Sequence, residues 1–351
     1  MNKIENPFTI SFGVEPYNVI LRNTDLNDII NIFSSQNPQS KTLTITGPRG
    51  SGKTVLLSQT KKYFDNLDNW ICVDLNPNDD MLEQLAALIF DKGKIKHLFL
   101  KAEFNFSFSG FGITITGSEP VSNVYALLDK MLAYLKKKDI RLLILVDDVS
   151  NNEYMKKFIP TYQNIIRNEY QAFLLMTGLY ENIYKLERSD NLTFLARTPK
   201  IQLGLLNLRS ITYEYMKIFN IDMDDALELA KTTNGYAYAF QLLGSILYND
   251  GKTKIDDEIL RKYDILLEDN SYSLIWESLS TNEKKILLSI VSSNEIKDII
   301  NDTNMSNSSI QVYKKNLEKA GLIDTQTRGQ IIFVLPRFKE FVQFKKKLLE
   351  N

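Results

Sequence analysis

The sequence has one cysteine, one histidine and almost no net charge. The cysteine, Cys72, cannot form an internal disulfide, and it lies in the apolar run 70–73, which is typical of a buried strand. His97 has no cysteine or second histidine near it in the sequence, which argues against a zinc site or a histidine-based nucleophilic triad. The formal charge is only −1, so any contact with DNA would need a local basic surface.

Long apolar runs are also absent. No run approaches the roughly 18 residues that a membrane helix requires, and residues 1–9 lack the apolar core of a signal peptide. We therefore expect a cytoplasmic protein without membrane contact. The chain has 351 residues, of which 44% are hydrophobic and 24% are charged, which is ordinary for a folded protein of two or three domains.

Residues 47–54 read Gly-Pro-Arg-Gly-Ser-Gly-Lys-Thr, the pattern of a phosphate-binding loop. A β-branched segment precedes this loop and a helical pattern follows it, so strand, loop and helix come in the required order. Such a loop points backbone amides at phosphate oxygens, and its glycines permit close approach. Lys53 would reach the β and γ phosphates of ATP, and Thr54 would offer its hydroxyl to Mg²⁺. The expected contacts with ATP or ADP are Gly47, Pro48, Arg49, Gly50, Ser51, Gly52, Lys53, Thr54 and Val55.

The alternative interpretation of the loop is a glycine turn with a solvated lysine. A second feature favours the phosphate site: Asp147 and Asp148 follow an apolar run at 141–146. Ligands of open α/β sheets bind where strands end, so Asp147 is predicted to hold Mg²⁺ through water and Asp148 to polarise the attacking water. A strand end followed by a helix cap would give the same pattern. Asp148 is one methylene shorter than the glutamate commonly used, so we expect slow turnover.

Two further residues are candidates for the reaction. Thr177 follows the apolar run 172–176 and could hydrogen-bond the γ phosphate or the water; the alternative is a threonine that caps a turn. Arg197 could supply a cation to the transition state, in cis or from a neighbouring subunit, and a surface salt bridge is the competing account. With Lys53 and Asp148 they form the predicted catalytic set.

The alternation of strands with helices predicts an α/β fold, in which helices flank a mostly parallel sheet. We expect this P-loop core over residues 1–206, with an inserted β-hairpin at about 102–116. The alternating phenylalanines of the hairpin would face the core or a docking partner. A helical lid is predicted over 207–275 and a winged helix-turn-helix over 276–351.

The C-terminal region opens on Ser-Thr-Asn-Glu at 280–283, which has the form of a capping box. Helical patterns follow, and two short strands at 322–325 and 330–335 would form the wing. Residues 281–351 carry 12 Lys and Arg against 8 Asp and Glu, a modest basic excess. The residues of 306–335 that would face duplex DNA are Ser308, Ser309, Gln311, Lys314, Lys315 and Arg328. The alternative is a module that packs on the ATPase core or binds protein.

Several of these segments resemble the AAA+ and STAND-type ATPases of bacteria and archaea, near the origin-initiator ATPases. The resemblance is carried by residues 6–8 (Asn-Pro-Phe), 12–16 (Phe-Gly-Val-Glu-Pro), 47–54, 194–197 (Phe-Leu-Ala-Arg) and the stretch 234–244, which is similar to the family's lid-helix motif. It implies a five-stranded core, a helical lid, a C-terminal winged helix and a sensor role for Thr177. The paired aspartates are the form common in STAND proteins.

The sequence also departs from this family. Residues 235–237 read Gly-Tyr-Ala, whereas the family has Gly-Tyr-Pro, and the lid lacks the arginine that some AAA+ proteins use as a second sensor. Near the adenine pocket related proteins have Val-Gly-Arg, but residues 20–22 read Ile-Leu-Arg, so only Arg22 matches.

Taken together, these patterns predict an ATPase that acts as a molecular switch. ATP and Mg²⁺ would bind between core and lid, the lid would respond to the nucleotide, and the winged helix would be repositioned on duplex DNA. The alternative is a signalling or scaffolding ATPase whose winged helix binds a protein partner, with nucleotide-dependent self-association as a further option. A metabolic kinase is disfavoured, because the C-terminal region adds no evident small-substrate site.

Overall fold

The fold is that of a computed structural model of the chain. It describes residues 5–11, 16–92, 123–325 and 330–350, and the backbone of three short strands between 104 and 120. His97, Arg328 and residues 12–15, which the sequence analysis singled out, lie outside these ranges.

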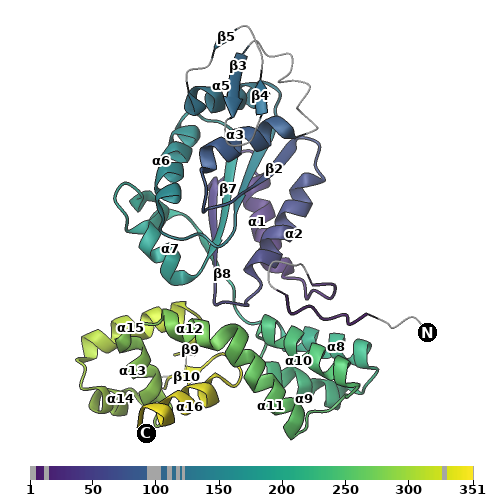
Figure 1. The fold of residues 1–351 in the computed structure, drawn as a ribbon, viewed down its shortest axis with the longest axis vertical. Helices are drawn as coiled ribbons and strands as arrows, with labels where there is room; N and C mark the ends of the chain where they lie inside the picture. Colours follow the sequence, from purple (N-terminus) through teal and green to yellow (C-terminus); the bar gives the residue numbers. More distant parts are fainter. Residues whose placement is uncertain are drawn as a thin grey trace. The chain divides into compact units, whose positions relative to one another are not determined.

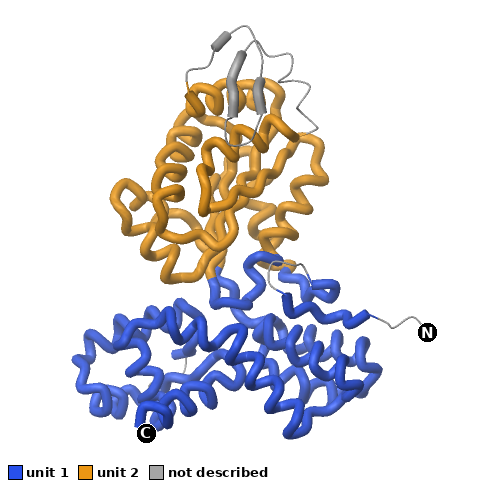
Figure 2. Tube along the Cα trace, viewed as in Figure 1, with its two compact units in different colours: residues 1–22, 47–55, 202–351 blue, residues 23–46, 56–201 orange. Residues whose placement is uncertain are grey.

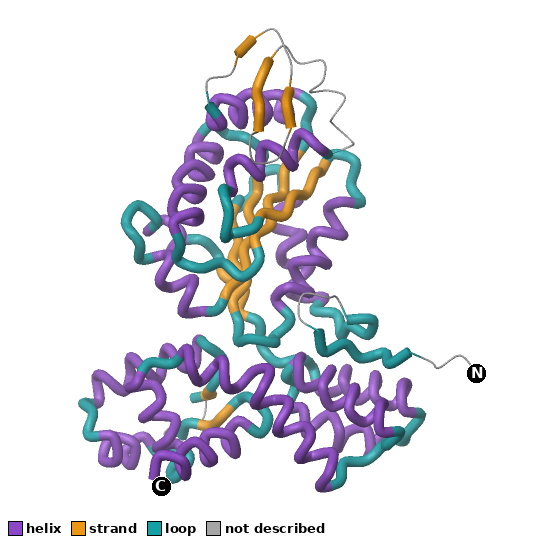
Figure 3. The backbone as a smooth tube through the Cα atoms, viewed as in Figure 1, coloured by secondary structure: helices purple, strands orange, loops and turns teal. Residues whose placement is uncertain are grey.

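The chain forms two compact units (Figure 2). The sheet unit consists of Asn23–Thr46 and Leu56–Ile201, and the helical unit consists of Met1–Arg22, Gly47–Val55 and Gln202–Asn351. Most strands belong to the sheet unit, whereas helices dominate the helical unit (Figure 3). The glycine-rich loop, at 47–55, therefore belongs to the same unit as the C-terminal half of the chain. The division into core, lid and winged helix stays a prediction.

A five-stranded sheet with the order β2-β6-β7-β1-β8 forms the centre of the sheet unit. The strands are β1 (Thr42–Thr46), β2 (Trp70–Leu75), β6 (Arg141–Val146), β7 (Ala172–Gly178) and β8 (Lys200–Gln202). The pairs β2–β6, β6–β7 and β7–β1 are all parallel. This confirms the predicted α/β class with a mostly parallel sheet. It also means that β1, β6 and β7 end at the same edge.

Helices cover both faces of this sheet (Figure 1). They are α1 (Asn23–Ser34), α2 (Lys53–Asp65), α3 (Met81–Asp91), α5 (Val124–Lys137), α6 (Glu153–Arg167) and α7 (Tyr180–Glu187). Successive strand residues face opposite sides. Leu142 and Ile144 thus join the core formed with α3, α5 and α6. Phe173 meets Phe33 of α1 on the other face, with ring centroids 5.2 Å apart.

A small second sheet lies in the segment between α3 and α5. Its strands are β3 (Phe104–Phe108), β4 (Ile113–Ile115) and β5 (Glu119–Pro120). β3 pairs antiparallel with β4, with Phe106 opposite Ile115, and parallel with β5. The ends of the hairpin expected at 102–116 lie outside the described residues.

Residues 208–278 of the helical unit form a bundle of helices. Its helices are α8 (Leu208–Phe219), α9 (Met223–Thr233), α10 (Ala237–Asp250), α11 (Asp257–Leu267), the π-helical turn η2 (Glu268–Tyr272) and α12 (Ser273–Ser278). The N-terminal segment packs on this bundle through Phe8, which lies against Tyr215 and Phe240. Gly244 makes room for it, since a Cβ there would lie 2.3 Å from the Phe8 ring.

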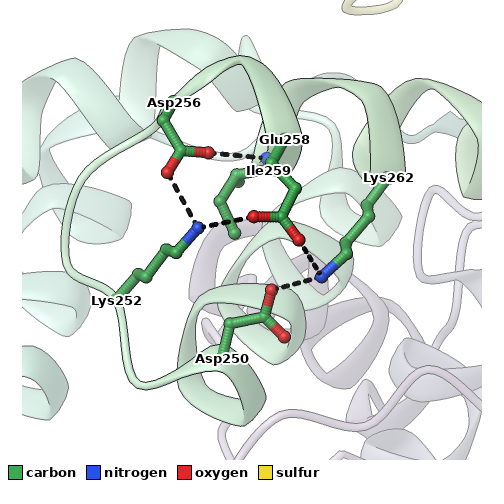
Figure 4. Close-up of polar contacts among 6 residues, drawn as sticks. All are labelled: Asp250, Lys252, Asp256, Glu258, Ile259 and Lys262. Carbon is green, nitrogen blue, oxygen red and sulfur yellow. Dashed lines mark hydrogen bonds and ion pairs between the residues drawn. The ribbon is translucent and has the colours of Figure 1, made fainter.

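Ion pairs close the loop between α10 and α11 (Figure 4). Lys252 contacts Asp256 at 2.8 Å and Glu258 at 3.1 Å. Lys262 contacts Glu258 at 3.0 Å and Asp250 at 2.6 Å. These partners raise the pKa of both lysines. The exposed network holds the two helix ends together.

The C-terminal region contains α13 (Thr281–Ile290), α14 (Ile296–Thr303), α15 (Asn307–Lys319), β9 (Ile323–Asp324), β10 (Ile332–Phe333) and α16 (Phe338–Glu350). The predicted capping box is present: the Glu283 amide donates to Ser280 Oγ, and the Ser280 amide donates to the Glu283 carboxylate. Gly321 follows α15 with φ +74°, the left-handed conformation in which a glycine commonly ends a helix. In the part of the chain that the structure describes, no helix has the length and apolar character needed to span a membrane.

Candidate functional site

The loop of residues 47–55 leaves β1 and runs directly into α2. Gly50 and Gly52 have φ angles of +74° and +92°, a region that disfavours residues with a Cβ. Lys53 folds back over the loop, and its ammonium group donates to the Gly47 carbonyl at 3.0 Å and the Pro48 carbonyl at 2.8 Å. Thr54 and Val55 are half-buried in the first turn of α2. The chain thus gathers a cation, a hydroxyl and successive backbone amides in one turn.

The beginning of α10 holds two carbonyls of this loop. The hydroxyl of Tyr236 donates to the Arg49 carbonyl at 2.5 Å, and the amide of Tyr238 donates to the Gly50 carbonyl at 3.0 Å. Tyr236 is the N-cap residue of α10 and makes no side-chain cap bond. The Tyr238 amide, which has no partner inside the helix, is therefore satisfied by the loop.

A third carbonyl is held by the N-terminal segment. One guanidinium nitrogen of Arg22 donates to the Ser51 carbonyl at 3.0 Å and to the Gly204 carbonyl at 2.7 Å. In a trans peptide, the carbonyl and the next amide point in opposite directions. Bonds to the carbonyls of 49, 50 and 51 thus orient the amides of 50, 51 and 52, of which the Ser51 amide donates to the Pro48 carbonyl at 3.2 Å.

The loop packs closely around a buried hydroxyl. The hydroxyl oxygen of Ser51 is buried and has no hydrogen-bond partner among the residues that the structure describes. A Cβ on Gly47 would lie 2.6 Å from that oxygen, and one on Gly50 would lie 2.5 Å from the Tyr236 hydroxyl. The glycines are therefore required for the close packing of the turn. Oriented amides and the Lys53 cation together suit phosphate oxygens.

The two predicted carboxylates follow β6. Asp148 is exposed with φ +50°, and Asp147 is partly buried. The hydroxyl of Thr177, at the end of β7, donates a hydrogen bond to the Asp147 carboxylate. The hydroxyl oxygen of Thr177 also accepts a hydrogen bond from the Asp148 amide at 3.0 Å. Thr177 thus joins the ends of two neighbouring strands and brings three predicted site residues together.

The remaining predicted residues are mostly exposed. Arg197 is exposed at the end of the 3-10 turn Thr193–Arg197. On α15, Ser308, Ser309, Gln311 and Lys315 are exposed, and Lys314 is partly buried. Ile310 and Leu317 form the buried face of α15, as their spacing predicts. Tyr313 is partly buried, and its hydroxyl accepts a bond from Asn282 at 2.7 Å.

Comparisons with solved structures identify the fold. A Walker-type ATPase of Pyrococcus abyssi is 12% identical to this chain. The match covers 93% of this chain and 96% of the ATPase, with a TM-score of 0.63. The ORC2 protein of Aeropyrum pernix, in ADPNP and ADP complexes, is 14% identical to this chain. The match covers 97% of this chain and 98% of ORC2, with a TM-score of 0.59. The chain has the fold of a P-loop ATPase. The expected resemblance to P-loop ATPases near the origin initiators is thus confirmed as a likeness of fold over nearly the whole chain.

Sequence comparisons are less informative. Residues 269–342 match the model of a domain of unknown function (DUF8462). No curated protein matches the sequence.

Sequence reasoning did not assign the contacts of Tyr236 and Tyr238 with the loop. Both residues lie in the stretch 234–244, whose resemblance to a lid motif drew attention to it. That resemblance was the available signal, because tyrosines 187 and 188 residues from their partners in the loop have no local pattern that reveals the contact. The role near adenine implied for Arg22 stays a prediction, beside its observed contact with the loop.

Proposed function

We propose that this chain binds ATP with Mg²⁺ at residues 47–55 and hydrolyses it slowly. The loop itself carries the proposal: two glycines in the left-handed region, oriented amides and Lys53 form the chemistry that binds a polyphosphate. The fold supports it as well, because the Aeropyrum pernix ORC2 structure that shares it was determined with ADPNP and ADP.

Binding would exchange hydrogen bonds within the loop for bonds to phosphate. Lys53 would leave the carbonyls of Gly47 and Pro48 and turn to the β and γ phosphates. Thr54 and Asp147 offer the hydroxyl and carboxylate oxygens that Mg²⁺ prefers. A bound Mg²⁺ would neutralise charge on the phosphates.

Hydrolysis would depend on the carboxylates. Asp148 is exposed, and we assign it the role of polarising the attacking water. Thr177 holds the Asp147 carboxylate through its hydroxyl and would keep that oxygen donor oriented. Arg197 is proposed as the cation for the transition state, supplied in cis or by a second copy of the chain.

We further propose that residues 276–351 are a winged helix that carries the output on duplex DNA. One support is the polar face of α15, where Ser308, Gln311 and Lys315 are exposed. The other is the modest excess of basic over acidic residues in this region. A protein partner is the second candidate. Val312, 58% exposed on the same helix, favours it because an apolar side chain contributes nothing to phosphate binding.

The test is phosphate release from ATP, measured with and without duplex DNA at low salt. The proposal expects slow release that requires Mg²⁺, is lost in Lys53→Ala and increases with DNA. Release that is unchanged by DNA, together with no measurable DNA affinity, would favour the protein partner. A chain that neither binds nor hydrolyses ATP would contradict the proposed function itself.

A further inference from the structure

Tyr236 lies between the glycine-rich loop and a π-helical turn. Its hydroxyl has one proton, which must go to the Arg49 carbonyl because a carbonyl can only accept. The Ser271 hydroxyl, 2.9 Å away, must therefore be the donor in its bond with Tyr236. Both residues are buried, and burial raises the pKa of the tyrosine, so the phenol keeps its proton.

Ser271 belongs to η2, the turn that connects α11 with α12. π-helical turns are rare in proteins and occur often at functional positions. The next residue, Tyr272, is also buried, and its hydroxyl donates to the Pro336 carbonyl just before α16. Tyr272 and Phe338 pack edge to face, with ring centroids 5.0 Å apart. One short turn therefore contacts both the Tyr236 hydroxyl and the start of α16.

The segment that Tyr272 contacts is itself fixed. Arg337 has φ +59°, which is unusual for a residue with a large side chain. Its guanidinium donates to both carboxylate oxygens of Asp264 on α11, at 2.8 and 2.6 Å, and to Glu340 at 2.7 Å. The bond to Asp264 raises the pKa of the guanidinium, which stays charged. A left-handed residue held by two carboxylates fixes the direction in which α16 leaves the turn.

The loop also touches the C-terminal region directly. A Cβ on Gly321, at the end of α15, would lie 2.9 Å from the ring of Pro48. Pro48, the residue before Arg49, thus lies close to the end of α15.

We propose that the Tyr236 hydroxyl is a positioning group for the phosphate-binding loop and links it, through Ser271 and Tyr272, to the start of α16. When the hydroxyl holds the Arg49 carbonyl, the Gly50 amide is held in the direction that faces phosphate. A nucleotide that fixes this peptide favours the bonds of Tyr236 and Ser271, and hence the docking of Pro336. Coupling of this kind is reciprocal, so a docked α16 favours nucleotide binding. The nucleotide part of the inference rests on the proposed function, whereas the positioning of the loop does not.

The test compares Tyr236→Phe with Tyr215→Phe. Tyr215 is a matched control because it is buried in the same unit and its hydroxyl also donates to a backbone carbonyl, that of Phe240 at 2.8 Å. Without nucleotide, hydrogen exchange of residues 47–55 should be about tenfold faster in Tyr236→Phe and nearly unchanged in Tyr215→Phe. With ATP, the Kd should rise about tenfold in the first variant only. Equal exchange and equal Kd in the two variants would overturn the proposal.

Ser271→Ala tests the link while leaving the tyrosine in place. ATP should slow hydrogen exchange at residues 337–341 in the parent, and this effect should be lost in Ser271→Ala and in Tyr236→Phe. An undiminished effect in Ser271→Ala would overturn the link, and this variant keeps the proposal testable if Tyr236→Phe does not fold. A parent chain that binds no ATP would refute the proposed function and the link, whereas exchange without nucleotide would still decide the role of Tyr236.

Discussion

The hydroxyl of Thr177 donates a hydrogen bond to the carboxylate of Asp147. Thr177→Val would keep the shape of the side chain and remove this bond. We expect Mg²⁺-dependent ATP turnover to fall about 10-fold to 100-fold, as is usual when a partner of a metal ligand is lost. ATP affinity measured without Mg²⁺ should stay the same, because the loop of residues 47–55 is not altered.

The control is Thr177→Ser, which retains the hydroxyl and should retain most of the turnover. Both are measured by phosphate release at several Mg²⁺ concentrations. If Thr177→Val is as active as the parent, the hydroxyl serves only to join the ends of β6 and β7.

Asp148→Asn should leave ATP bound and prevent its hydrolysis. The amide is nearly isosteric with the carboxylate but cannot accept a proton, so turnover should fall by about 10²-fold to 10⁴-fold. The Kd for ATP should change by less than about threefold. Asp147→Asn provides the comparison, because it should weaken the dependence of ATP binding on Mg²⁺. Normal turnover in Asp148→Asn would assign the activation of water to another residue.

Lys314→Ala with Lys315→Ala tests whether the output is DNA. Each lost phosphate contact should flatten the slope of log affinity against log salt by about 0.9, so the double variant should lose up to about two such units. Lys136→Ala with Lys137→Ala removes the same charge from exposed positions on α5 and should leave the slope unchanged. A parent chain without measurable affinity for duplex DNA at low salt would contradict the DNA output and favour a protein partner.

Cys72 offers an independent measure of nucleotide binding. Burial raises the pKa of its thiol, so at neutral pH the group is protonated and unreactive until the sheet opens. A nucleotide that binds only the folded chain should slow labelling, by about 100-fold when ATP is present at 100 times its Kd. The measurement is the labelling rate with a thiol reagent, with and without ATP. Identical rates would indicate that the sheet opens without losing ATP, or that ATP does not bind.

Sequence patterns predicted best those elements that are specified by residues close together in the sequence. The strand expected at 141–146 is β6 without a change of boundary, because a run of five apolar residues buried on both faces has no competing interpretation next to Asp147. The capping box at Ser280 is equally local, since both of its partners lie within four residues. The expected wing strands prove shorter, with only two paired residues each.

Several helices were not predicted individually, among them α5, α6, α7 and α16. α6 contains Pro160, which interrupts the helical signal, although Phe158, Ile159 and Tyr162 are fully buried on one face. α16 follows the left-handed Arg337, and its direction depends on contacts with Asp264, 73 residues earlier.

The same distinction holds for the candidate site. Residues 47–54 and the paired aspartates were identified because their chemistry is contiguous in sequence. The contacts of Arg22 and Tyr236 with the loop were not predicted. These two residues lie 29 and 187 residues from their partners in the sequence and meet the loop only in the folded chain.

ATP binding by the parent chain and by Lys53→Ala, measured by titration calorimetry in the presence of Mg²⁺, tests the central claim most directly. Lys53 is partly exposed and lies outside the apolar core, so its removal should not unfold the chain. Lys62→Ala, an exposed position on the same helix, removes the same charge away from the loop. We predict that the parent and Lys62→Ala bind ATP alike and that Lys53→Ala binds about a hundredfold more weakly. Binding of equal strength in all three, or none in the parent, would contradict the account.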